Sequence, residues 1–387
     1  MARSPLAHRR DVLRALGAVG AALPIAGCGY VHVGLTPPRP DVEVEFLPTP
    51  PVAELPREPA EVMALPREGI GRLEIAESVA REIVLPPRLP AGGTVGLVAP
   101  AGVVRSRRQL TDAVASLERL GFRTKVGRNV LARFGFLAGT DAERARDLMR
   151  MVRDPEVDAI VAVRGGWGCA RILPLLDYDE IAAHPKPIVG YSDVTSLLLA
   201  IYARTGLVTF HGPVGVSTWE GLTAESFVRT LVDGAPLAIA PETRRNRDRT
   251  ETVRGGVAEG PVLGGNLTVI AGLAGSDYLP DTTDHLLFFE EVREDAYRLD
   301  RMLVQLELAG FFRDVAGVAF GQCSSCSSSD GTSAEDVIRR HLRRVNAPSV
   351  FGAPIGHVSP VYTLPVGLPA RLDADAGTLE YLRPGVA

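Results

Sequence analysis

The stretch that decides the fold is residues 158–192, which read DAIVAVRGGWGCARILPLLDYDEIAAHPKPIVGYS. Residues 158–163 and 187–191 are short apolar runs of the kind that form buried strands, and the chain between Gly168 and Leu176 has a helical pattern. The first run ends in a cluster of glycines, and the second ends on Ser192. This order predicts parallel strands joined by a helix, the repeating unit of a sheet with helices on both faces.

The same alternation extends upstream. Residues 94–100 form another apolar run, and apolar residues recur at helical spacing after it. Thr140 and Glu143 form a capping box, which predicts a helix from there to about Val152. The predicted fold class is therefore α/β, with an N-terminal parallel-sheet domain of the flavodoxin or Rossmann type at residues 91–237.

A charged, turn-rich segment divides the rest of the chain. Residues 238–255, which include RRNRDR at 244–249, are predicted to be a linker between two domains. Residues 256–387 are predicted to form a smaller C-terminal α/β domain rich in short strands. It contains an amphipathic helix at 297–308 whose apolar side packs in a core.

Composition excludes several classes of protein. The 387 residues are 46% hydrophobic and carry 42 basic against 46 acidic side chains, a formal net charge of -4. A balance this close to neutral provides no global basic field for nucleic acid, so we expect no nucleic-acid partner. The four cysteines are too few for a disulfide scaffold and do not form the two pairs of a structural zinc site.

The N-terminal residues have the pattern of an export signal. Residues 1–28 combine a basic front, an apolar stretch and Cys28, and the pair Arg9 and Arg10 resembles a twin-arginine signal. Residues 25–28, IAGC, resemble a bacterial lipobox, which predicts an exported protein, periplasmic or at the cell surface, anchored to a membrane through lipidated Cys28. The alternative is a plain secretory signal in which Cys28 is incidental. Residues 29–90 contain 12 prolines and are predicted to be an extended tether.

Two neighbouring strand ends carry residues suited to catalysis. The carboxyl ends of parallel strands meet at one edge of a sheet and collect ligands there. Ser192 follows one strand on a sharp turn, two residues after Gly190, which predicts a nucleophile whose neighbouring amide, that of Asp193, can stabilise an oxyanion. The alternative is that Ser192 only caps the following helix. An α/β-hydrolase elbow would have glycine where Val194 stands.

Seven separated motifs resemble the bacterial LD-carboxypeptidase family, which includes muramoyl-tetrapeptide carboxypeptidases and microcin C immunity peptidases. Together they extend from about residue 93 to the C-terminus, in the order and spacing of that family. The motifs are RGGWG at 164–168, GYSDVT at 190–195, FHGP at 210–213, GPVLGGNLT at 260–268, LFFEEV at 287–292, YRLDRML at 297–303 and PIGH at 354–357.

The resemblance implies a serine, glutamate and histidine triad. By motif, Ser192 corresponds to the nucleophile, Glu290 to the residue that orients the base, and His357 to the general base. The oxyanion donors would be the amide of Asp193 and one from Gly165 or Gly166. Since Ser192 precedes the predicted linker and the other two follow it, the site would form between the two domains.

Competing residues exist for two of these roles. His211 ends the strand after the nucleophile helix and is the alternative general base. Glu291 is the alternative carboxylate, although adjacent residues on a strand point to opposite faces. His184, His285 and His341 lie in polar stretches where we expect solvated side chains.

The remaining cysteines have structural interpretations. Cys323 and Cys326 form a CxxC pair without a second pair of ligands, so we expect incidental cysteines in a loop or a small disulfide rather than a metal or redox site. Cys169 is expected in the core. No feature of the sequence requires a metal or an organic cofactor.

The resulting hypothesis is an exported serine carboxypeptidase, with the substrate taken from the resemblance. It would cleave the bond between an L-centre residue and a terminal D-amino acid in peptidoglycan stem peptides. The alternatives are an immunity-type amidase that acts on a peptide-nucleotide antibiotic, and a lipoprotein that binds muropeptides without turnover. The family also suggests a homodimer, which no motif in the chain specifies.

Overall fold

The structure, a computed structural model, describes residues 82–240 and 250–387. These residues all belong to a single structural unit. The predicted signal at 1–28 and residues 29–81 of the predicted tether lie outside the described residues. Within the part that is described, no helix is both long enough and apolar enough to cross a bilayer.

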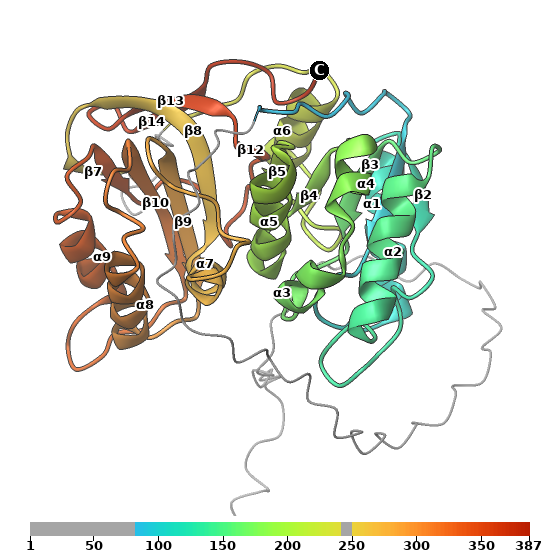
Figure 1. Ribbon diagram of the computed structural model, residues 1–387, viewed down its shortest axis with the longest axis horizontal. Coiled ribbons are helices and arrows are strands. Elements are labelled where there is room, and N and C mark those ends of the chain that lie inside the picture. The colour runs from blue at the N-terminus through green and yellow to red at the C-terminus, as the bar shows by residue number, and fades with distance from the viewer. Residues whose placement is uncertain (1–81, 241–249) are drawn as a thin grey trace, which may run out of the picture. The chain divides into compact units, whose positions relative to one another are not determined.

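The first sheet is the parallel sheet that residues 158–192 predict (Figure 1). Its six strands have the order β12-β5-β4-β3-β1-β2, and every neighbouring pair except β12 with β5 is parallel. The inner strands β1, β3 and β4 are buried along their whole length, as expected for strands covered by helices on both faces. The strands are β1 (Thr94–Val98), β2 (Arg123–Val126), β3 (Ala159–Ala162), β4 (Ile188–Gly190), β5 (Thr209–His211) and β12 (Leu364–Val366).

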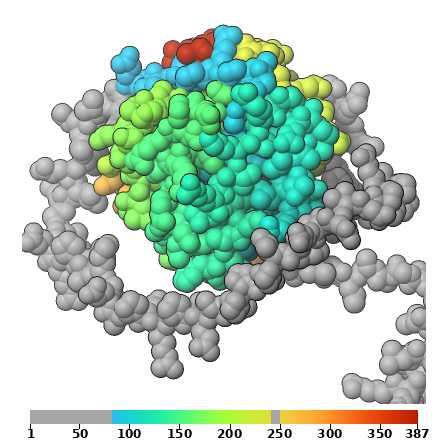
Figure 2. Space-filling model, turned by 90° about the vertical axis from the view of Figure 1, so that its right-hand side faces the viewer, coloured from blue at the N-terminus to red at the C-terminus, as the bar shows by residue number. Residues whose placement is uncertain are grey.

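Helices follow these strands in the predicted alternation. The capping box at the start of α2 is confirmed, because the Thr140 hydroxyl accepts from the Glu143 amide and the Glu143 carboxylate accepts from the Thr140 amide. This first half of the described chain, coloured blue to green, forms most of the face shown in Figure 2. Its helices are α1 (Arg107–Arg119), α2 (Asp141–Arg153), α3 (Cys169–Ile172), α4 (Tyr178–Ala183), α5 (Thr195–Thr205) and α6 (Leu222–Leu231), with short 3-10 turns η1 (Leu173–Leu175) and η2 (Ser192–Val194).

The second sheet has eight strands in the order β6-β14-β13-β8-β9-β10-β11-β7. The four strands β8 to β11 are parallel, and the outer ones are antiparallel. The strands are β6 (Ala238–Ile239), β7 (Glu251–Arg254), β8 (Val257–Asn266), β9 (Leu286–Val292), β10 (Gly317–Ser324), β11 (Ser349–Phe351), β13 (Pro369–Asp373) and β14 (Thr378–Tyr381). The helices are α7 (Leu267–Leu273), α8 (Ala296–Leu308), which confirms the predicted amphipathic helix, and α9 (Ala334–Leu342). Helices α5 and α7 lie between the two sheets (Figure 1).

One strand crosses from the C-terminal half to the first sheet, and the predicted linker contains strands of the second sheet, which corrects the predicted boundaries. Both described ends of the predicted linker at 238–255 are strands of the second sheet, since β6 pairs with β14 and β7 pairs with β11. Residues 241–249 lie outside the described residues. In addition, β12 leaves the predicted C-terminal domain and pairs with β5 of the first sheet. The crossing segment at 352–363, which joins β11 to β12, therefore runs from one sheet to the other.

The end of the predicted tether is also part of the fold. Val84 forms a bridge with Leu207, and the Leu89 amide donates to the Leu231 carbonyl. Leu89 itself is completely buried. Residues 82–90 therefore pack against the fold instead of forming free tether, because Leu89 belongs to the hydrophobic core and Val84 and Leu85 pack against it.

Candidate active site

The candidate nucleophile lies at the carboxyl end of the first sheet, on a strained turn. Ser192 lies two residues after the end of β4 and has φ 64, in the left-handed region that residues other than glycine rarely adopt. Such a conformation costs on the order of 1–2 kcal/mol. Neither η2 nor α5 has a side-chain cap, so the alternative that Ser192 serves only as a helix cap is wrong. The turn instead resembles the nucleophile elbow, in which strain presents Oγ to the site.

The glycine-rich loop after β3 contacts this serine. A Cβ placed on Gly165 would lie 2.8 Å from the Ser192 Cβ and 3.0 Å from its Oγ. Only glycine allows the loop backbone to approach the nucleophile this closely. Gly166 has φ 128, and its Cβ would meet Gly102 rather than Ser192. The structure thus brings Gly165 directly against the nucleophile, with Gly166 one residue further away.

The predicted base and carboxylate form a buried pair. His357 Nδ1 lies 2.6 Å from Glu290 Oε2, although the two residues are 67 positions apart in the chain. Glu290 projects from β9 and is fully buried, whereas His357 sits on the segment that crosses between the sheets. A Cβ on Gly356 would lie 3.0 Å from the Glu290 Cβ, so glycine before His357 permits the contact.

This pair faces the nucleophile turn. The His357 ring centroid lies 4.9 Å from that of Tyr191, the residue that precedes Ser192. Side chains from two sheets, and from three distant parts of the sequence, therefore meet around one turn. Tyr191 was not predicted as a site residue, and a single aromatic side chain after a buried strand gives no signal that separates it from core.

The charges of the pair define which nitrogen is the base. Burial raises the pKa of Glu290, but the nearby His357 outweighs it and holds that pKa below 4.5. Burial lowers the pKa of His357, but the charge and hydrogen bond of Glu290 raise it above 6.5. Since an ionised carboxylate can only accept a hydrogen bond, Nδ1 carries the proton and donates the hydrogen bond to Glu290. Nε2 of the neutral ring is then left as a proton acceptor.

The neighbouring carboxylate points the other way, as the alternation along a strand predicts. Glu291 accepts hydrogen bonds from Asn266 Nδ2 at 2.9 Å, the Thr268 amide at 2.8 Å and the Thr268 hydroxyl at 2.7 Å. Burial, followed by the charge of Glu290, raises the pKa of Glu291. The Asn266 amide also donates to Thr195 Oγ1 at 3.1 Å, which ties the second sheet to the start of α5. Glu291 therefore organises the junction of the sheets and does not contact the base.

The alternative base, His211, is placed differently. It is 1% exposed, and neither of its ring nitrogens has a hydrogen-bond partner. Its ring packs edge-on against Phe288 at 5.1 Å and Tyr191 at 6.0 Å. Burial lowers the pKa of His211 to about 4, so its ring is neutral at physiological pH. No carboxylate accepts a hydrogen bond from either ring nitrogen of His211, so its tautomer and ring position are not fixed as Glu290 fixes those of His357.

The side chain of Asp193 links the two loops of the site. Its Oδ2 accepts the Cys169 amide at 2.8 Å, at the start of α3 directly after the glycine-rich loop. Asp193 is half-buried, and loss of solvent around its carboxylate raises its pKa despite the hydrogen bond from Cys169. The sequence analysis considered only the backbone amide of Asp193. Its carboxylate also fixes the position of the glycine-rich loop relative to Ser192.

The described cysteines and His341 are all in structural positions outside the candidate triad. Cys323 and Cys326 form a disulfide, one of the two expected alternatives, although Cys323 lies in β10 and not in a loop. Cys169 is a buried free thiol, as expected. His341 is 3% exposed and lies 3.0 Å from Asp300, so the prediction of a solvated side chain is wrong for it. Over residues 82–240 and 250–387, no three His, Cys, Asp or Glu side chains are arranged to hold a metal ion.

A strained serine turn, a buried histidine–glutamate pair and a glycine-rich loop against the serine are typical of a hydrolase. Two family comparisons agree with this class. The LD-carboxypeptidase N-terminal domain matches residues 95–212, and the LD-carboxypeptidase C-terminal domain matches residues 259–372. The chain belongs to the LD-carboxypeptidase family and is a peptidase of that family.

Individual relatives support the same assignment. The chain is 37% identical over 296 residues to the probable murein peptide carboxypeptidase of Bacillus subtilis strain 168, covering 74% of this chain and 91% of that one. It is 33% identical over 295 residues to the murein tetrapeptide carboxypeptidase of Pseudomonas aeruginosa, covering 74% and 95%. The structure of the microcin C7 self-immunity protein MccF with aspartyl sulfamoyl adenosine matches with TM-score 0.72 and 28% identity, covering 79% and 100%.

Proposed function

We propose that the chain is a serine carboxypeptidase that removes a terminal D-amino acid from an L-centre residue of peptidoglycan stem peptides. The observation that carries this proposal is the 2.6 Å contact between His357 and Glu290, beside the strained turn of Ser192. The substrate is supported by relatives named murein peptide and murein tetrapeptide carboxypeptidase. These relatives are matched over more than nine-tenths of their length.

The proposed mechanism has two steps that share one base. In acylation, His357 Nε2 takes the proton of Ser192 Oγ while Oγ attacks the carbonyl of the L-centre residue. The same proton then goes to the nitrogen of the departing D-amino acid as the peptide bond breaks. In deacylation, His357 takes a proton from water, the hydroxyl attacks the ester, and the proton returns to Ser192.

The protein stabilises the charges that develop in each step. The imidazolium that forms on His357 is stabilised by Glu290, which also fixes the tautomer. The negative charge on the carbonyl oxygen would be met by the backbone amides of Asp193 and of the Gly165–Gly166 turn. This assignment is supported by the close packing of Gly165 against Ser192, which brings the loop backbone next to the attacking oxygen.

The test is mass spectrometry of a tetrapeptide incubated with the purified protein. We expect loss of one terminal D-alanine, and no loss with Ser192→Ala. Ser116→Ala, an exposed serine of α1, serves as the matched control and should retain the activity. A wild-type protein that binds the tetrapeptide but never shortens it would contradict the enzyme and support the non-catalytic binding alternative.

A second candidate activity is an immunity-type peptidase, favoured by the similarity to MccF. The same triad would then act on an aminoacyl sulfamoyl nucleoside. Incubation with aspartyl sulfamoyl adenosine separates the two activities. Release of aspartate, with no reaction on the tetrapeptide, would favour this second candidate.

We also propose that the protein is exported and held at a membrane through Cys28. The proposal is supported by the signal pattern of residues 1–28 and by the Cys323–Cys326 disulfide, since disulfides persist in oxidising compartments. Fractionation of cells that produce Cys28→Ala tests the anchor. We expect the wild type in the membrane fraction and the variant in the soluble exported fraction; a wild type confined to the cytosol would contradict export.

A further inference from the structure

Two exposed aromatic side chains lie together at the edge of the candidate site. Trp167 is 56% exposed and Phe136 is 60% exposed. Their ring centroids are 6.2 Å apart, with the planes at 82°. We call this pair the aromatic rim. In the described part of the chain only four Phe, Tyr or Trp side chains are exposed, by 41% or more. Phe136 and Trp167 are the two most exposed, and the others are Phe134, two residues before Phe136, and Tyr297.

The aromatic rim is attached to the nucleophile through short connections. Gly165, which packs against Ser192, precedes Trp167 by two residues, a distance of at most about 7 Å along an extended chain. The Gly102 amide donates to the Gly165 carbonyl at 3.3 Å, and the Val103 amide donates to the Phe136 carbonyl at 3.0 Å. Both aromatic residues are therefore bound through one segment, at 102–103, to the loop that touches Ser192.

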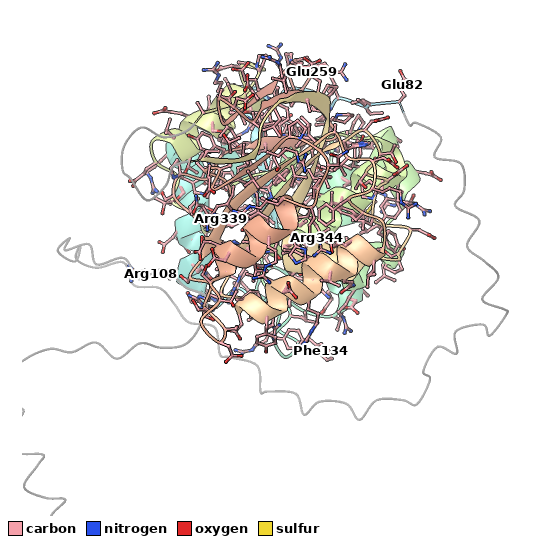
Figure 3. The ribbon with its side chains drawn as sticks, turned by 90° about the vertical axis from the view of Figure 1, so that its left-hand side faces the viewer. Glu82, Arg108, Phe134, Glu259, Arg339 and Arg344 are labelled. Carbon is pink, nitrogen blue, oxygen red and sulfur yellow. A yellow bond between two sulfur atoms is a disulfide. The ribbon has the colours of Figure 1, made fainter. Side chains whose placement is uncertain are left out.

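The backbone beneath the aromatic rim is held firmly. Arg144 is 1% exposed, and its Nη1 donates to the Gly168 carbonyl at 2.8 Å and also to the Pro100 carbonyl. Gly168 follows Trp167, so the indole projects from a fixed position. In Figure 3, Phe134, which lies two residues before Phe136 in the segment between β2 and α2, is at the lower edge of the molecule. Exposed aromatic rings on a rigid backbone are suited to binding, because little conformational freedom is lost when a ligand stacks on them.

The chemistry of the proposed substrate indicates what such rings would bind. A carboxypeptidase accommodates only one residue beyond the bond it cleaves, so the rest of the substrate extends from the other side of the site. Three extended residues span about 10 Å, and a stem peptide is attached at that end to an N-acetylated amino sugar. A pyranose presents a face of C–H groups that packs on aromatic rings.

We propose that Trp167 and Phe136 form a subsite for the amino sugar of a muropeptide, so that glycosylated stem peptides are preferred over free ones. This inference rests on the proposed function. It assigns the selectivity to the aromatic rim, which belongs to the first half of the chain, and not to Glu290 or His357. The subsite acts on binding of the substrate and not on the bond that breaks.

The test compares two substrates that differ only in the sugar. We would measure kcat and KM for a free tetrapeptide and for the same tetrapeptide linked to N-acetylglucosaminyl-N-acetylmuramic acid. For the wild type, we expect a higher kcat/KM with the sugar. Trp167→Ala should raise KM for the glycosylated substrate about three- to tenfold, a typical effect of one aromatic contact, and change the free tetrapeptide less than about twofold.

Two further variants sharpen the comparison. Phe136→Ala should have the same selective effect, because it removes the partner ring. Leu308→Ala is the matched control, since Leu308 is 84% exposed at the end of α8 and should leave both substrates unchanged. Trp167→Phe should recover most of the preference, because it restores an aromatic face.

Three outcomes would overturn the subsite. Equal losses on both substrates would mean that Trp167 acts through the glycine-rich loop on Ser192, and no loss on either would mean that the rim binds nothing. In a fluorescence titration of Ser192→Ala protein, quenching by adenosine monophosphate but not by the disaccharide would assign the rim to a nucleotide instead. A wild type that cleaves neither substrate refutes the proposed function itself, which distinguishes the two failures.

Discussion

Replacing Glu290 by glutamine tests how the base is activated. The change preserves the shape of the side chain and removes its charge, which lies 2.6 Å from His357 Nδ1 in a fully buried position. Two unit charges at that separation interact by about 6 kcal/mol at an effective dielectric constant of about 20. Glutamine still offers a hydrogen bond, so the loss is smaller than this value. We expect kcat to fall by about 10³- to 10⁴-fold.

The pH profile gives a second and more specific readout of the same variant. Burial lowers the pKa of His357, but Glu290 raises it above 6.5. The neutral base therefore forms only as the pH rises through this raised pKa. The acid limb of kcat/KM in the wild type should therefore lie above pH 6.5. Without the Glu290 carboxylate, burial and the charge of Arg293 lower the pKa of His357, and only the charge of Glu291, a smaller effect than burial, raises it. The acid limb of Glu290→Gln should move below pH 6.5.

The assay is the rate of D-alanine release between pH 4 and 9, with the free energy of unfolding measured in parallel. Glu291→Gln is the matched control, because it removes a neighbouring buried carboxylate that has other partners. We expect Glu291→Gln to lose stability yet keep an acid limb above pH 6.5. An unchanged acid limb in Glu290→Gln, with the protein folded, would refute the assignment of Glu290.

Three other perturbations have defined outcomes. Gly165→Ala forces a Cβ to within 3.0 Å of the nucleophile oxygen and should lower kcat about 10²-fold or more. The control Gly272→Ala, where a Cβ meets no atom within 4 Å, should keep wild-type kinetics. Equal kcat values for the two variants would contradict the close contact of Gly165 with Ser192. His211→Phe, a similar volume among aromatic rings, should cost less than about tenfold in kcat/KM and keep the acid limb; a loss comparable to that of Glu290→Gln would make His211 the base. Reduction of the Cys323–Cys326 disulfide should lower the free energy of unfolding by about 2 kcal/mol from its short loop, measured by urea denaturation with and without reductant; an unchanged midpoint would contradict a stabilising role.

The sheet of the first half could be predicted because its signals are local. The apolar runs at 158–163 and 187–191 become β3 and β4, and the capping box at Thr140 starts α2. Each signal depends on residues within a few positions of one another, in a chain whose buried strands are continuous apolar segments. The position of Ser192 after β4 follows from the same pattern.

The crossing of β12 from the C-terminal half to the first sheet could not be predicted in this way. Strand β12 has three residues and pairs with β5, which lies about 150 positions earlier in the chain. Short strands such as β12 and β6 carry too few residues for a periodic pattern, and their partners are chosen by tertiary packing. The prediction of a linker at 238–255 was wrong for this reason, because a charged segment between two very short edge strands has the pattern of a loop.

The site shows the same division. Resemblance to a family indicated Ser192, Glu290 and His357, but spacing alone did not show that Glu290 and His357 would meet. The carboxylate of Asp193 and the ring of Tyr191 were missed, since their roles depend on contacts with Cys169 and His357 across the fold. No local pattern distinguishes such residues from ordinary core or turn residues.

The most direct test of activation of Ser192 by His357 is the rate at which a fluorophosphonate labels the protein as a function of pH. Peptide mapping by mass spectrometry should find the label on Ser192, with a rate that rises through an ionisation above pH 6.5. His357→Gln should abolish labelling while the protein remains folded. Labelling of a different residue, or a labelling rate on Ser192 that is unaffected by His357→Gln, would contradict the triad.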